Sequence, residues 1–263
     1  MSDRISLDDI KTYLTKHGFP EKVDAAVVLG SGLGDFSARI DHAQEVHYAD
    51  IPGFPVSTVE GHAGSLISGT VRNKRVIAFS GRFHHYEGHP FSQTVLPVRM
   101  AKHFGAHILI LSNAAGAVNP KLNVGDLMVI DDIFRFFHYI NTGRSEPFRY
   151  NHYETAERVR KIASAIGLDI QRGTYLYTKG PNYETKAEIR AFQRLGVDVV
   201  GMSTAPELQE ASQIGLKAAA ISLVTNMAAG LGKNKLDHAE VKEAAQMKKA
   251  EFADLVTELI EKL

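Results

Sequence analysis

Five short apolar runs in this chain each end in a turn built from small, polar or glycine residues. The runs are Ala25–Leu29, Arg75–Phe79, His107–Leu111, Val197–Val200 and Ala219–Val224. The turns that follow are Gly30-Ser-Gly-Leu-Gly34, Ser80-Gly-Arg-Phe-His-His-Tyr86, Ser112-Asn-Ala-Ala-Gly116, Gly201-Met-Ser-Thr204 and Thr225-Asn226. In open α/β sheets, ligands bind outside the carboxyl ends of the strands. The five turns are therefore predicted to gather donors for an oxyanion at one rim of a sheet.

Helical stretches alternate with these runs along the chain. Residues 7–17 are expected to form a helix that stops at Gly18, and Ser92–Phe104 a partly buried helix that stops at Gly105. Such alternation is typical of helices packed outside a largely parallel sheet. No repeat or obvious linker divides the chain. We therefore predict an α/β fold in which residues 1–263 form a single domain, with a mixed, largely parallel twisted central sheet flanked by helices.

Three helix starts are marked by capping residues. Thr185-Lys-Ala-Glu188 and Thr204-Ala-Pro-Glu207 both fit a capping box, the second with proline just inside the helix. Met202 and Ser203 would then lie at the entrance of a helix whose free backbone N–H groups favour an anion. The last helix is expected to begin near Asp237, which can act as its cap.

Composition excludes several classes of protein. Lys+Arg and Asp+Glu both number 30, so no basic excess indicates nucleic-acid binding. The chain has 0 cysteines, which excludes disulfide scaffolds and cysteine nucleophiles. The first residues lack the apolar core of a signal peptide, and no run approaches the length of a membrane span. We expect a soluble, cytoplasmic protein that does not bind a membrane.

The turn Gly30-Ser-Gly-Leu-Gly34 either cradles a phosphate or is only a tight connection. Position 35, where a dinucleotide fingerprint needs its third glycine, is Asp35, and no P-loop lysine follows. Arg82 and His84 come after a strand and offer donors to phosphate oxygens, although a solvated surface loop is an equally good interpretation.

Other kinds of catalytic site find little support. His85 and His89 are four residues apart, but Gly88 and Pro90 prevent the helix that would aim both at one metal ion. No G-x-S-x-G elbow occurs. Glu87 and Glu184 lie near the predicted rim without the second acid that a glycosidase needs. If a glycosidic bond is broken here, the nucleophile should come from a bound anion.

At this point the motifs resemble those of the trimeric purine nucleoside phosphorylases. The matching segments are Leu29-Gly-Ser-Gly-Leu-Gly34, Ile51-Pro-Gly-Phe-Pro55, Gly61-His-Ala-Gly64, Gly81-Arg-Phe-His-His-Tyr-Glu-Gly88, Ser112-Asn-Ala-Ala-Gly116, Gly180-Pro-Asn-Tyr-Glu-Thr185, Val200-Gly-Met-Ser-Thr204 and Thr225-Asn226. The likeness covers nearly the whole chain in order. It implies a homotrimer that cleaves purine (deoxy)ribonucleosides with inorganic phosphate, which is a co-substrate, and that needs no metal and no organic cofactor.

The resemblance also implies roles for individual residues. The residues implied to bind phosphate are Ser31, Arg82, His84, Ala114 through its backbone, and Ser203, with His62 close by. The pentose is expected against Tyr86 and Met202, with His238 reaching its 5′-hydroxyl. The purine is expected on Tyr183, Glu184 and Asn226, and the catalytic residues are expected to be Asn226, Glu184 and His84. Glu87 matches a position that steadies the phosphate and sugar contacts.

The nature of position 226 indicates which purines are used. Asn226 can donate to the purine N7 while Glu184 accepts from N1–H of a 6-oxopurine, which favours inosine and guanosine over adenosine. A related phosphorylase for xanthosine or methylthio-nucleosides is the alternative. A nucleoside hydrolase and a catalytically silent nucleoside- or phosphate-binding module are the competing classes.

The chain departs from the family pattern in two places. The region between Asp132 and Gly173 is shorter, and the usual Asp-His-Ile-Asn run is replaced by Asp131-Asp-Ile-Phe134. In the family this region supplies an aromatic side chain to the neighbouring subunit's site, and the candidates here are Phe134, Phe136, Phe137 and Phe148. Pro206-Glu-Leu-Gln-Glu210 also replaces a valine-rich continuation. The irregular segment Phe134–Tyr153 is expected to be a lid, a binding loop, a subunit contact or a plain surface crossover.

Overall fold

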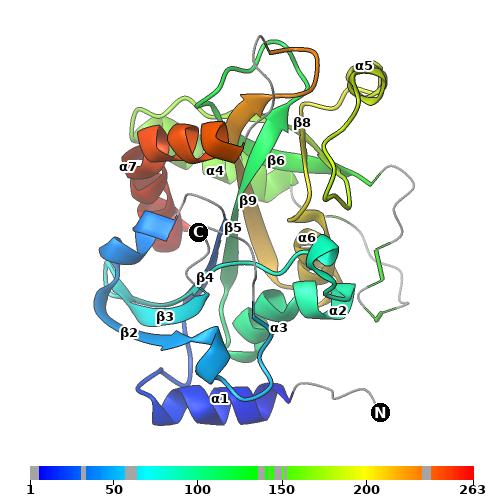
Figure 1. The fold of residues 1–263 in the computed structure, drawn as a ribbon. Coiled ribbons are helices and arrows are strands. Elements are labelled where there is room, and N and C mark those ends of the chain that lie inside the picture. The colour runs from blue at the N-terminus through cyan, green and yellow to red at the C-terminus, as the bar shows by residue number, and fades with distance from the viewer. Residues whose placement is uncertain are drawn as a thin grey trace.

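A computed structural model describes residues 6–30, 34–56, 64–135, 140–141, 143–144, 150, 153–232 and 238–263, with only the backbone at 34–35 and 238–247. In these residues nine strands form one mixed sheet with helices on both faces (Figure 1). The strands are β1 (Ala25–Leu29), β2 (Asp41–His47), β3 (Ser65–Val71), β4 (Lys74–Ser80), β5 (Ile108–Ala117), β6 (Leu127–Phe134), β7 (Gln171–Tyr177), β8 (Val199–Gly201) and β9 (Lys217–Met227). The α-helices are α1 (Leu7–Lys16), α2 (Phe91–Thr94), α3 (Leu96–His103), α4 (Tyr153–Ala165), α5 (Lys186–Arg194), α6 (Ala205–Gln213) and α7 (His238–Lys262). Short 3₁₀ turns are η1 (Gly34–Arg39), η2 (Tyr48–Asp50) and η3 (His85–Glu87).

The sheet closes on itself at one end. Its strand order is β2-β3-β4-β1-β5-β8-β7-β6-β9, and β9 also pairs with β5. The pairs β1–β4, β1–β5, β5–β9, β6–β7 and β7–β8 are parallel, whereas β2–β3, β3–β4, β5–β8 and β6–β9 are antiparallel. The long strands β5 and β9 therefore belong both to an open twisted sheet and to a closed ring of strands. This arrangement confirms the predicted mixed α/β fold.

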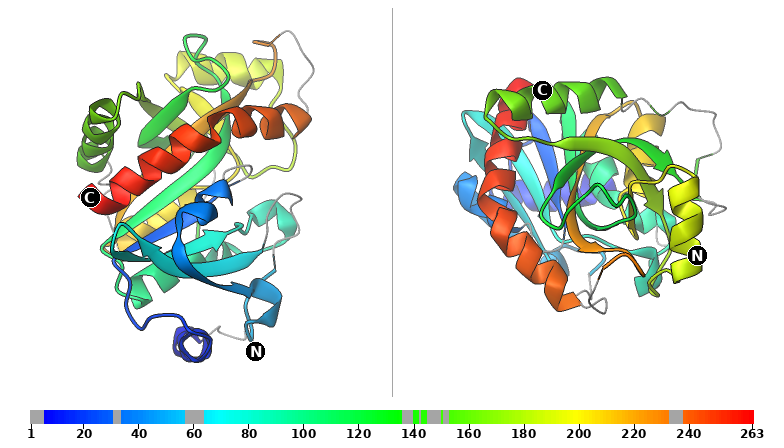
Figure 2. Two further views of the ribbon diagram at one scale, coloured as in Figure 1. Left: turned by 90° about the vertical axis from the view of Figure 1, so that its left-hand side faces the viewer. Right: turned by 90° about the horizontal axis from the view of Figure 1, so that it is seen from above.

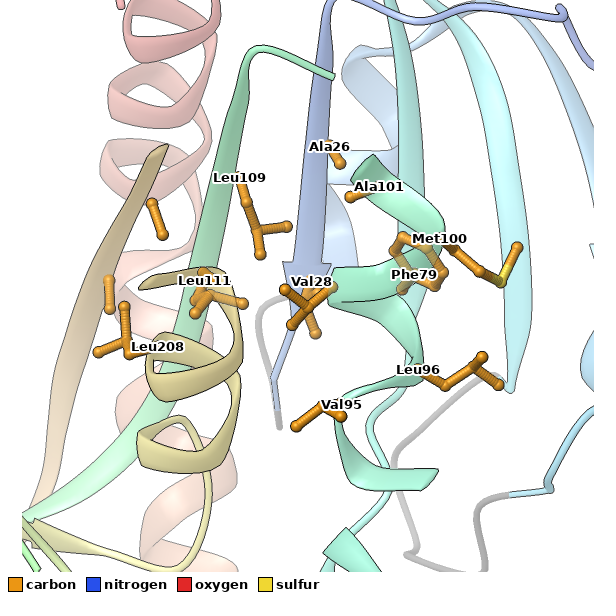
Figure 3. Packing of buried hydrophobic residues seen from close by; sticks show 14 of the residues in the cluster. Ala26, Val28, Phe79, Val95, Leu96, Met100, Ala101, Leu109, Leu111 and Leu208 are labelled. Atoms are coloured by element: carbon orange, nitrogen blue, oxygen red, sulfur yellow. The ribbon is translucent and has the colours of Figure 1, made fainter. Parts of the chain in front are cut away.

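The core lies on both faces of the sheet because its central strands are apolar throughout. Ala26 and Val28 of β1 point into a cluster with α1, α3 and α6, while Ala25 and Val27 point into a second cluster with α4 and α7. Alternate residues of a strand face opposite sides, so a continuous apolar run is needed for a strand covered on both faces. Figure 3 shows the first cluster, where Leu208 of α6 lies near Leu111 of β5.

The long C-terminal helix α7 covers the other face. Figure 2 shows it crossing the sheet obliquely with α4 beside it. Phe252, Leu255 and Leu259 are buried there. The apolar stripe that the sequence predicts for the last helix is thereby confirmed for these residues. Asp237, its expected cap, lies outside the described residues.

The predicted helices 7–17 and 92–104 have different outcomes. The first is confirmed as α1, with Ser6 as its N-cap and Gly18 at φ 88° beyond its end. The second is wrong as one helix, because the chain breaks at Val95 (φ −97°, ψ 4°) between α2 and α3. Pro97 lies in the first turn of α3, and proline has no N–H to continue a helix from the preceding turn.

Two predicted turns are wrong as turns. β5 runs on through Asn113 to Ala117, and β9 runs on through Thr225 to Met227. The two strands pair along this length with a register shift between Ala115 and Gly116. Small residues allow this close pairing, and an irregularity of this kind redirects side chains beside it. The polar residues of both segments therefore lie on strands.

In the described part of the chain, no helix is long and apolar enough to cross a membrane.

Candidate active site

A cavity of about 240 Å³ lies where the ends of several strands meet. Its lining from the segment after β4, from η3 and from β5 consists of Arg82, His84, Tyr86 and the small polar stretch Asn113, Ala114, Ala115 and Gly116. The remaining lining comes from the loop after β7, from the β8–α6 junction and from β9, and consists of Pro181, Tyr183, Glu184, Val200, Gly201, Met202, Ser203, Thr225, Asn226 and Ala228. The segments after four of the five predicted apolar runs therefore line a single cavity.

Arg82 is the buried cation of this cavity. Its Nε lies 3.0 Å from Glu207 of α6, and its Nη1 donates to the carbonyl oxygen of Ser112 at 2.7 Å. Both charged side chains of the pair are almost fully buried. Burial of a guanidinium is costly unless a carboxylate and hydrogen bonds compensate it. The pair therefore holds the guanidinium at one wall of the cavity.

His84 is oriented by Glu87 in a similar way. The Glu87 carboxylate accepts hydrogen bonds from His84 Nδ1 at 2.7 Å and from the His84 backbone N–H at 2.9 Å. The imidazole also stacks on Tyr86, with the ring centroids 4.8 Å apart. With Nδ1 held by the carboxylate, Nε2 is the ring atom that can meet a ligand.

Ser203 and Thr204 form the start of α6, and here one prediction is wrong. Thr204 is the N-cap residue, but its side chain makes no capping hydrogen bond, and Glu207 pairs with Arg82 instead of closing a capping box. Leaving the buried Arg82 without a carboxylate would cost more free energy than leaving the helix without a side-chain cap. By contrast, the capping box Thr185–Glu188 is confirmed at the start of α5.

The proposed sugar-contact residues Tyr86 and Met202 lie against Gly180. Gly180 has φ 65°, and a Cβ there would collide with Met202 Sδ and lie 3.0 Å from Tyr86 Cδ1. Burial, with Glu87 nearby, raises the pKa of Tyr86 to about 12, so its hydroxyl stays protonated at neutral pH. Glycine is therefore required where the loop after β7 meets these two side chains.

Glu184 lies on the same loop, half-buried in the cavity wall. Burial raises the pKa of its carboxyl, and hydrogen bonds from its backbone and from Thr178 partly offset this. The Thr178 hydroxyl donates to Glu184 Oε1 at 2.9 Å. The chain thus holds a carboxylate acceptor in a poorly solvated place. Tyr183 also lines the cavity and is 46% exposed.

Asn226 is held in a fixed orientation on β9. Thr225 Oγ1 donates to Asn226 Oδ1 at 3.1 Å, and Asn226 Nδ2 donates to the Met227 carbonyl oxygen at 3.2 Å. A Cβ at Gly116 would lie 3.1 Å from Asn226 Nδ2, so glycine gives this side chain its room. An amide nitrogen carries two hydrogens, and the second can therefore donate to a ligand.

Three of the expected site residues are not placed. Ser31 and His62 lie outside the described residues, and of His238 only the backbone is described, as the first residue of α7. Gly30, which opens the turn before Ser31, donates its N–H to Ser112 Oγ at 3.0 Å. The remaining expected residues line the cavity.

The sequence did not identify the residues that hydrogen-bond the cavity-lining side chains or backbone from outside the cavity. These are Glu207, which bonds Arg82, Tyr175, which bonds Ser203, and Thr178, which bonds Glu184. In the sequence, Glu207 fits a capping pattern, Tyr175 lies on β7 and Thr178 directly follows it. A polar residue after a buried strand was a usable signal for Thr178, whereas nothing local to the sequence pairs Glu207 with Arg82, 125 residues away.

The shortened region after β6 contacts α6. Gln209 Nε2 donates to the Ile140 carbonyl oxygen at 3.0 Å, and Arg144 Nε lies 3.0 Å from the buried Glu210. The two places where the chain departs from the family pattern are therefore in contact. Phe134 packs against residues of its own chain, while Phe136, Phe137 and Phe148 lie outside the described residues.

Among the described residues, no group of three or more His, Asp or Glu side chains is placed to hold a metal ion.

Comparison with known proteins gives consistent matches. The model of the phosphorylase superfamily matches residues 24–261. Purine nucleoside phosphorylase 1 of Bacillus subtilis is 40% identical over 99% of this chain and 98% of its own length. Purine nucleoside phosphorylase of Bos taurus is 36% identical over 94% of this chain and 92% of its own. The structure of Schistosoma mansoni purine nucleoside phosphorylase with inosine has a TM-score of 0.89 and 29% identity, and covers 98% of this chain and 96% of that chain.

Proposed function

The chain belongs to the phosphorylase superfamily, and from this premise we propose that it performs purine nucleoside phosphorolysis on 6-oxopurine nucleosides such as inosine and guanosine. The enzyme is a pentosyltransferase, and the relatives that cover 99% and 94% of this chain are named purine nucleoside phosphorylases. The observation that supports the choice of substrate is that a cation, a carboxylate and an amide line one cavity.

Each part of the cavity has a distinct task in this reaction. Arg82, His84 and Ser203 bind inorganic phosphate, whose oxygen attacks C1′ of the sugar. The bond from C1′ to N9 breaks, and its electron pair leaves on the purine while positive charge develops on the sugar. Asn226 donates to N7 of the departing base, and Glu184 accepts from N1–H. A preorganised donor of this sort contributes about 3–4 kcal/mol of transition-state stabilisation.

The reaction is tested by following hypoxanthine release from inosine spectroscopically, with and without phosphate. Release is expected only when phosphate is present, together with ribose 1-phosphate. Equal release in phosphate-free buffer would instead identify a nucleoside hydrolase. Tight binding of inosine and phosphate without turnover would identify a binding module.

Substrate preference is tested by competition among inosine, guanosine, adenosine, xanthosine and methylthioadenosine. We expect inosine and guanosine to have the highest kcat/KM, because Asn226 and Glu184 match a 6-oxopurine. A higher value for xanthosine or for methylthioadenosine would assign the chain to one of those related activities. Inorganic phosphate is proposed as the co-substrate, with no other cofactor.

We propose that residues 1–263 form one catalytic domain and that the enzyme is a homotrimer. The trimer is proposed from the resemblance to the trimeric purine nucleoside phosphorylases. Light scattering coupled to size exclusion is expected to give three times the mass of 28.9 kDa. The cytoplasmic location and the absence of nucleic-acid and membrane partners stay predictions.

A further inference from the structure

A buried tyrosine outside the cavity makes two hydrogen bonds to the backbone of Ser203. The Tyr175 hydroxyl on β7 donates to the Ser203 carbonyl oxygen at 3.0 Å and accepts from the Ser203 backbone N–H at 3.2 Å. Tyr175 is fully buried and is not part of the cavity lining. The Ser203 amide is therefore engaged by protein, and the hydroxyl is the group that Ser203 can offer to an anion.

The neighbouring backbone is built to admit this tyrosine. A Cβ at Gly201 would collide with the Tyr175 hydroxyl, so a side chain at this position would disrupt the two hydrogen bonds between Tyr175 and Ser203. Gly201 is not needed for a left-handed conformation, since its φ is not positive. Its role is the close approach of Tyr175 to the β8–α6 junction.

Thr204 holds an unusual backbone conformation beside Ser203. Its φ is 65° and its ψ −45°, and the Ala205 N–H donates to the Ser203 carbonyl oxygen at 2.6 Å, which makes a γ-turn. A β-branched residue at positive φ is a rare, strained arrangement that persists only where its surroundings hold it. Tyr175, which bonds the same carbonyl, is one of the groups that hold it.

A chain of hydrogen bonds gives the Ser203 hydroxyl a direction. Asn113 Nδ2 donates to Thr204 Oγ1 at 3.0 Å, and Thr204 Oγ1 lies 3.1 Å from Ser203 Oγ. Since an amide nitrogen can only donate, Thr204 accepts from Asn113 and can donate its own hydrogen to Ser203 Oγ. The Ser203 hydrogen is then available to point into the cavity.

We propose that Tyr175, Asn113 and Thr204 are positioning residues that make Ser203 a directed hydroxyl donor to the bound phosphate. Successive donors polarise one another, which strengthens the last hydrogen bond in such a chain. The inference rests on the proposed function, because it assigns the anion at Ser203 to inorganic phosphate. Tyr175, Asn113 and Thr204 do not contact the phosphate in this arrangement; they orient the serine that does.

Thr204→Val and Thr204→Ser test the chain, since valine keeps the shape of threonine and serine keeps its hydroxyl. Thr204→Val is expected to raise the KM for phosphate about tenfold, because the Ser203 hydroxyl is then no longer directed and its hydrogen bond to the anion is lost. The KM for inosine should change by less than about twofold, and Thr204→Ser should restore phosphate use. A parallel rise in both KM values, or no rescue by serine, would overturn the inference.

Tyr175→Phe tests the two hydrogen bonds between Tyr175 and Ser203, with Tyr177→Phe as the control on the same strand. Both remove a hydroxyl from a fully buried tyrosine, so both are expected to lower the melting temperature. Only Tyr175→Phe should raise the KM for phosphate. Equal effects of the two changes on phosphate use would mean that Tyr175 acts through general stability alone, against the inference.

A double-mutant cycle shows whether these residues act through Ser203. In a Ser203→Ala background, Thr204→Val and Tyr175→Phe are expected to leave the KM for phosphate unchanged. Undiminished effects in that background contradict the inference. Phosphate affinity is also measured by titration calorimetry, so that the outcome is decided even for an enzyme that does not turn over inosine.

Discussion

At the scale of single residues, the basic side chains of the cavity are each matched by a carboxylate. Arg82 is paired with Glu207, and His84 with Glu87. These pairs fix the donor atoms before a ligand arrives, so little reorganisation is needed when an anion binds. The residues proposed to bind the purine are oriented in the same way, because Thr178 hydrogen-bonds Glu184 and Thr225 hydrogen-bonds Asn226. These contacts orient the donor and acceptor atoms of the cavity side chains.

Asn226→Ala and Arg82→Ala should affect different substrates. Asn226→Ala is expected to lower kcat by about a hundredfold or more while the KM for phosphate stays near its original value, since the lost donor acts on the departing base. Arg82→Ala should mainly raise the KM for phosphate. Steady-state kinetics with each substrate varied separately distinguishes them. An Asn226→Ala enzyme with unchanged turnover of inosine would contradict the proposed base contact.

The pH dependence should report on Glu184. Its carboxyl must be ionised to accept from N1–H, and burial raises its pKa above the usual 4.5. As the pH falls through this raised pKa, kcat/KM for inosine is expected to fall. Thr178→Val removes a hydrogen bond to the carboxylate, so the acid limb should move to higher pH, while Thr178→Ser should leave it in place.

This profile is measured at saturating phosphate, because other ionisable side chains line the same cavity. Glu188 of α5 raises the pKa of Glu184, and Arg82, His84, Tyr86 and Tyr183 line the same cavity. An acid limb at the same pH in Thr178→Val and in the original enzyme would show that Glu184 is not the group that titrates.

At the scale of secondary-structure elements, the site depends on how strands and helices end. β5 and β9 continue past their apolar halves, and a register shift at Ala115 and Gly116 brings Asn226 beside β5. The helix α6 begins at the strained Thr204, which places Ser203 on the cavity wall. α5 begins at a capping box that directly follows Glu184. The side chains of the candidate site thus lie at or near the ends of strands and helices.

Thr185→Ala tests the role of the α5 cap. Loss of the cap is expected to reduce the free energy of unfolding by about 1 kcal/mol and to raise the KM for inosine, because Glu184 is the preceding residue. Ser6→Ala removes the cap of α1, which does not adjoin the cavity, and serves as the control. It should cost a similar free energy with no change in the KM for inosine. Chemical denaturation and steady-state kinetics measure both effects, and equal KM values for the two variants would refute the link.

At the scale of the whole molecule, the cavity joins parts of the chain that are distant in sequence. The Arg82–Glu207 pair connects the end of β4 to α6, and Tyr175 connects β7 to the β8–α6 junction. The closed ring of β5, β8, β7, β6 and β9, joined to β4 through β1, brings these segments together. The same buried contacts therefore serve both the fold and the site.

Glu207→Ala is accordingly expected to be among the most destabilising single changes. It leaves a buried guanidinium without its carboxylate, which costs about 3–5 kcal/mol. Glu207→Gln keeps the shape and one acceptor, so its loss should be smaller. Urea denaturation measures both. Asp254→Ala, which removes an exposed ion pair between α7 and Arg39, is the control with a small expected loss. Equal losses for Glu207→Ala and Asp254→Ala would contradict a structural role for the buried pair.

The sequence by itself determined the α/β class, the apolar strands and the polar segments that follow them. These features follow from local periodicity, which depends only on neighbouring residues. It also placed Arg82, His84, Ser203, Glu184 and Asn226 in one candidate site, through motifs in family order. It did not determine that Ser112–Gly116 and Thr225–Asn226 are strand, because pairing between β5 and β9 overrides their weak local preference.

Only the tertiary structure decided which partners hold the site residues. Glu207 reads as a helix cap in the sequence but neutralises Arg82, since a buried charge must find its opposite wherever the chain brings one near. Tyr175 reads as an ordinary strand residue but clamps Ser203. Such pairings join positions far apart along the chain, and only the folded arrangement of β4, β7 and α6 brings them within hydrogen-bond distance.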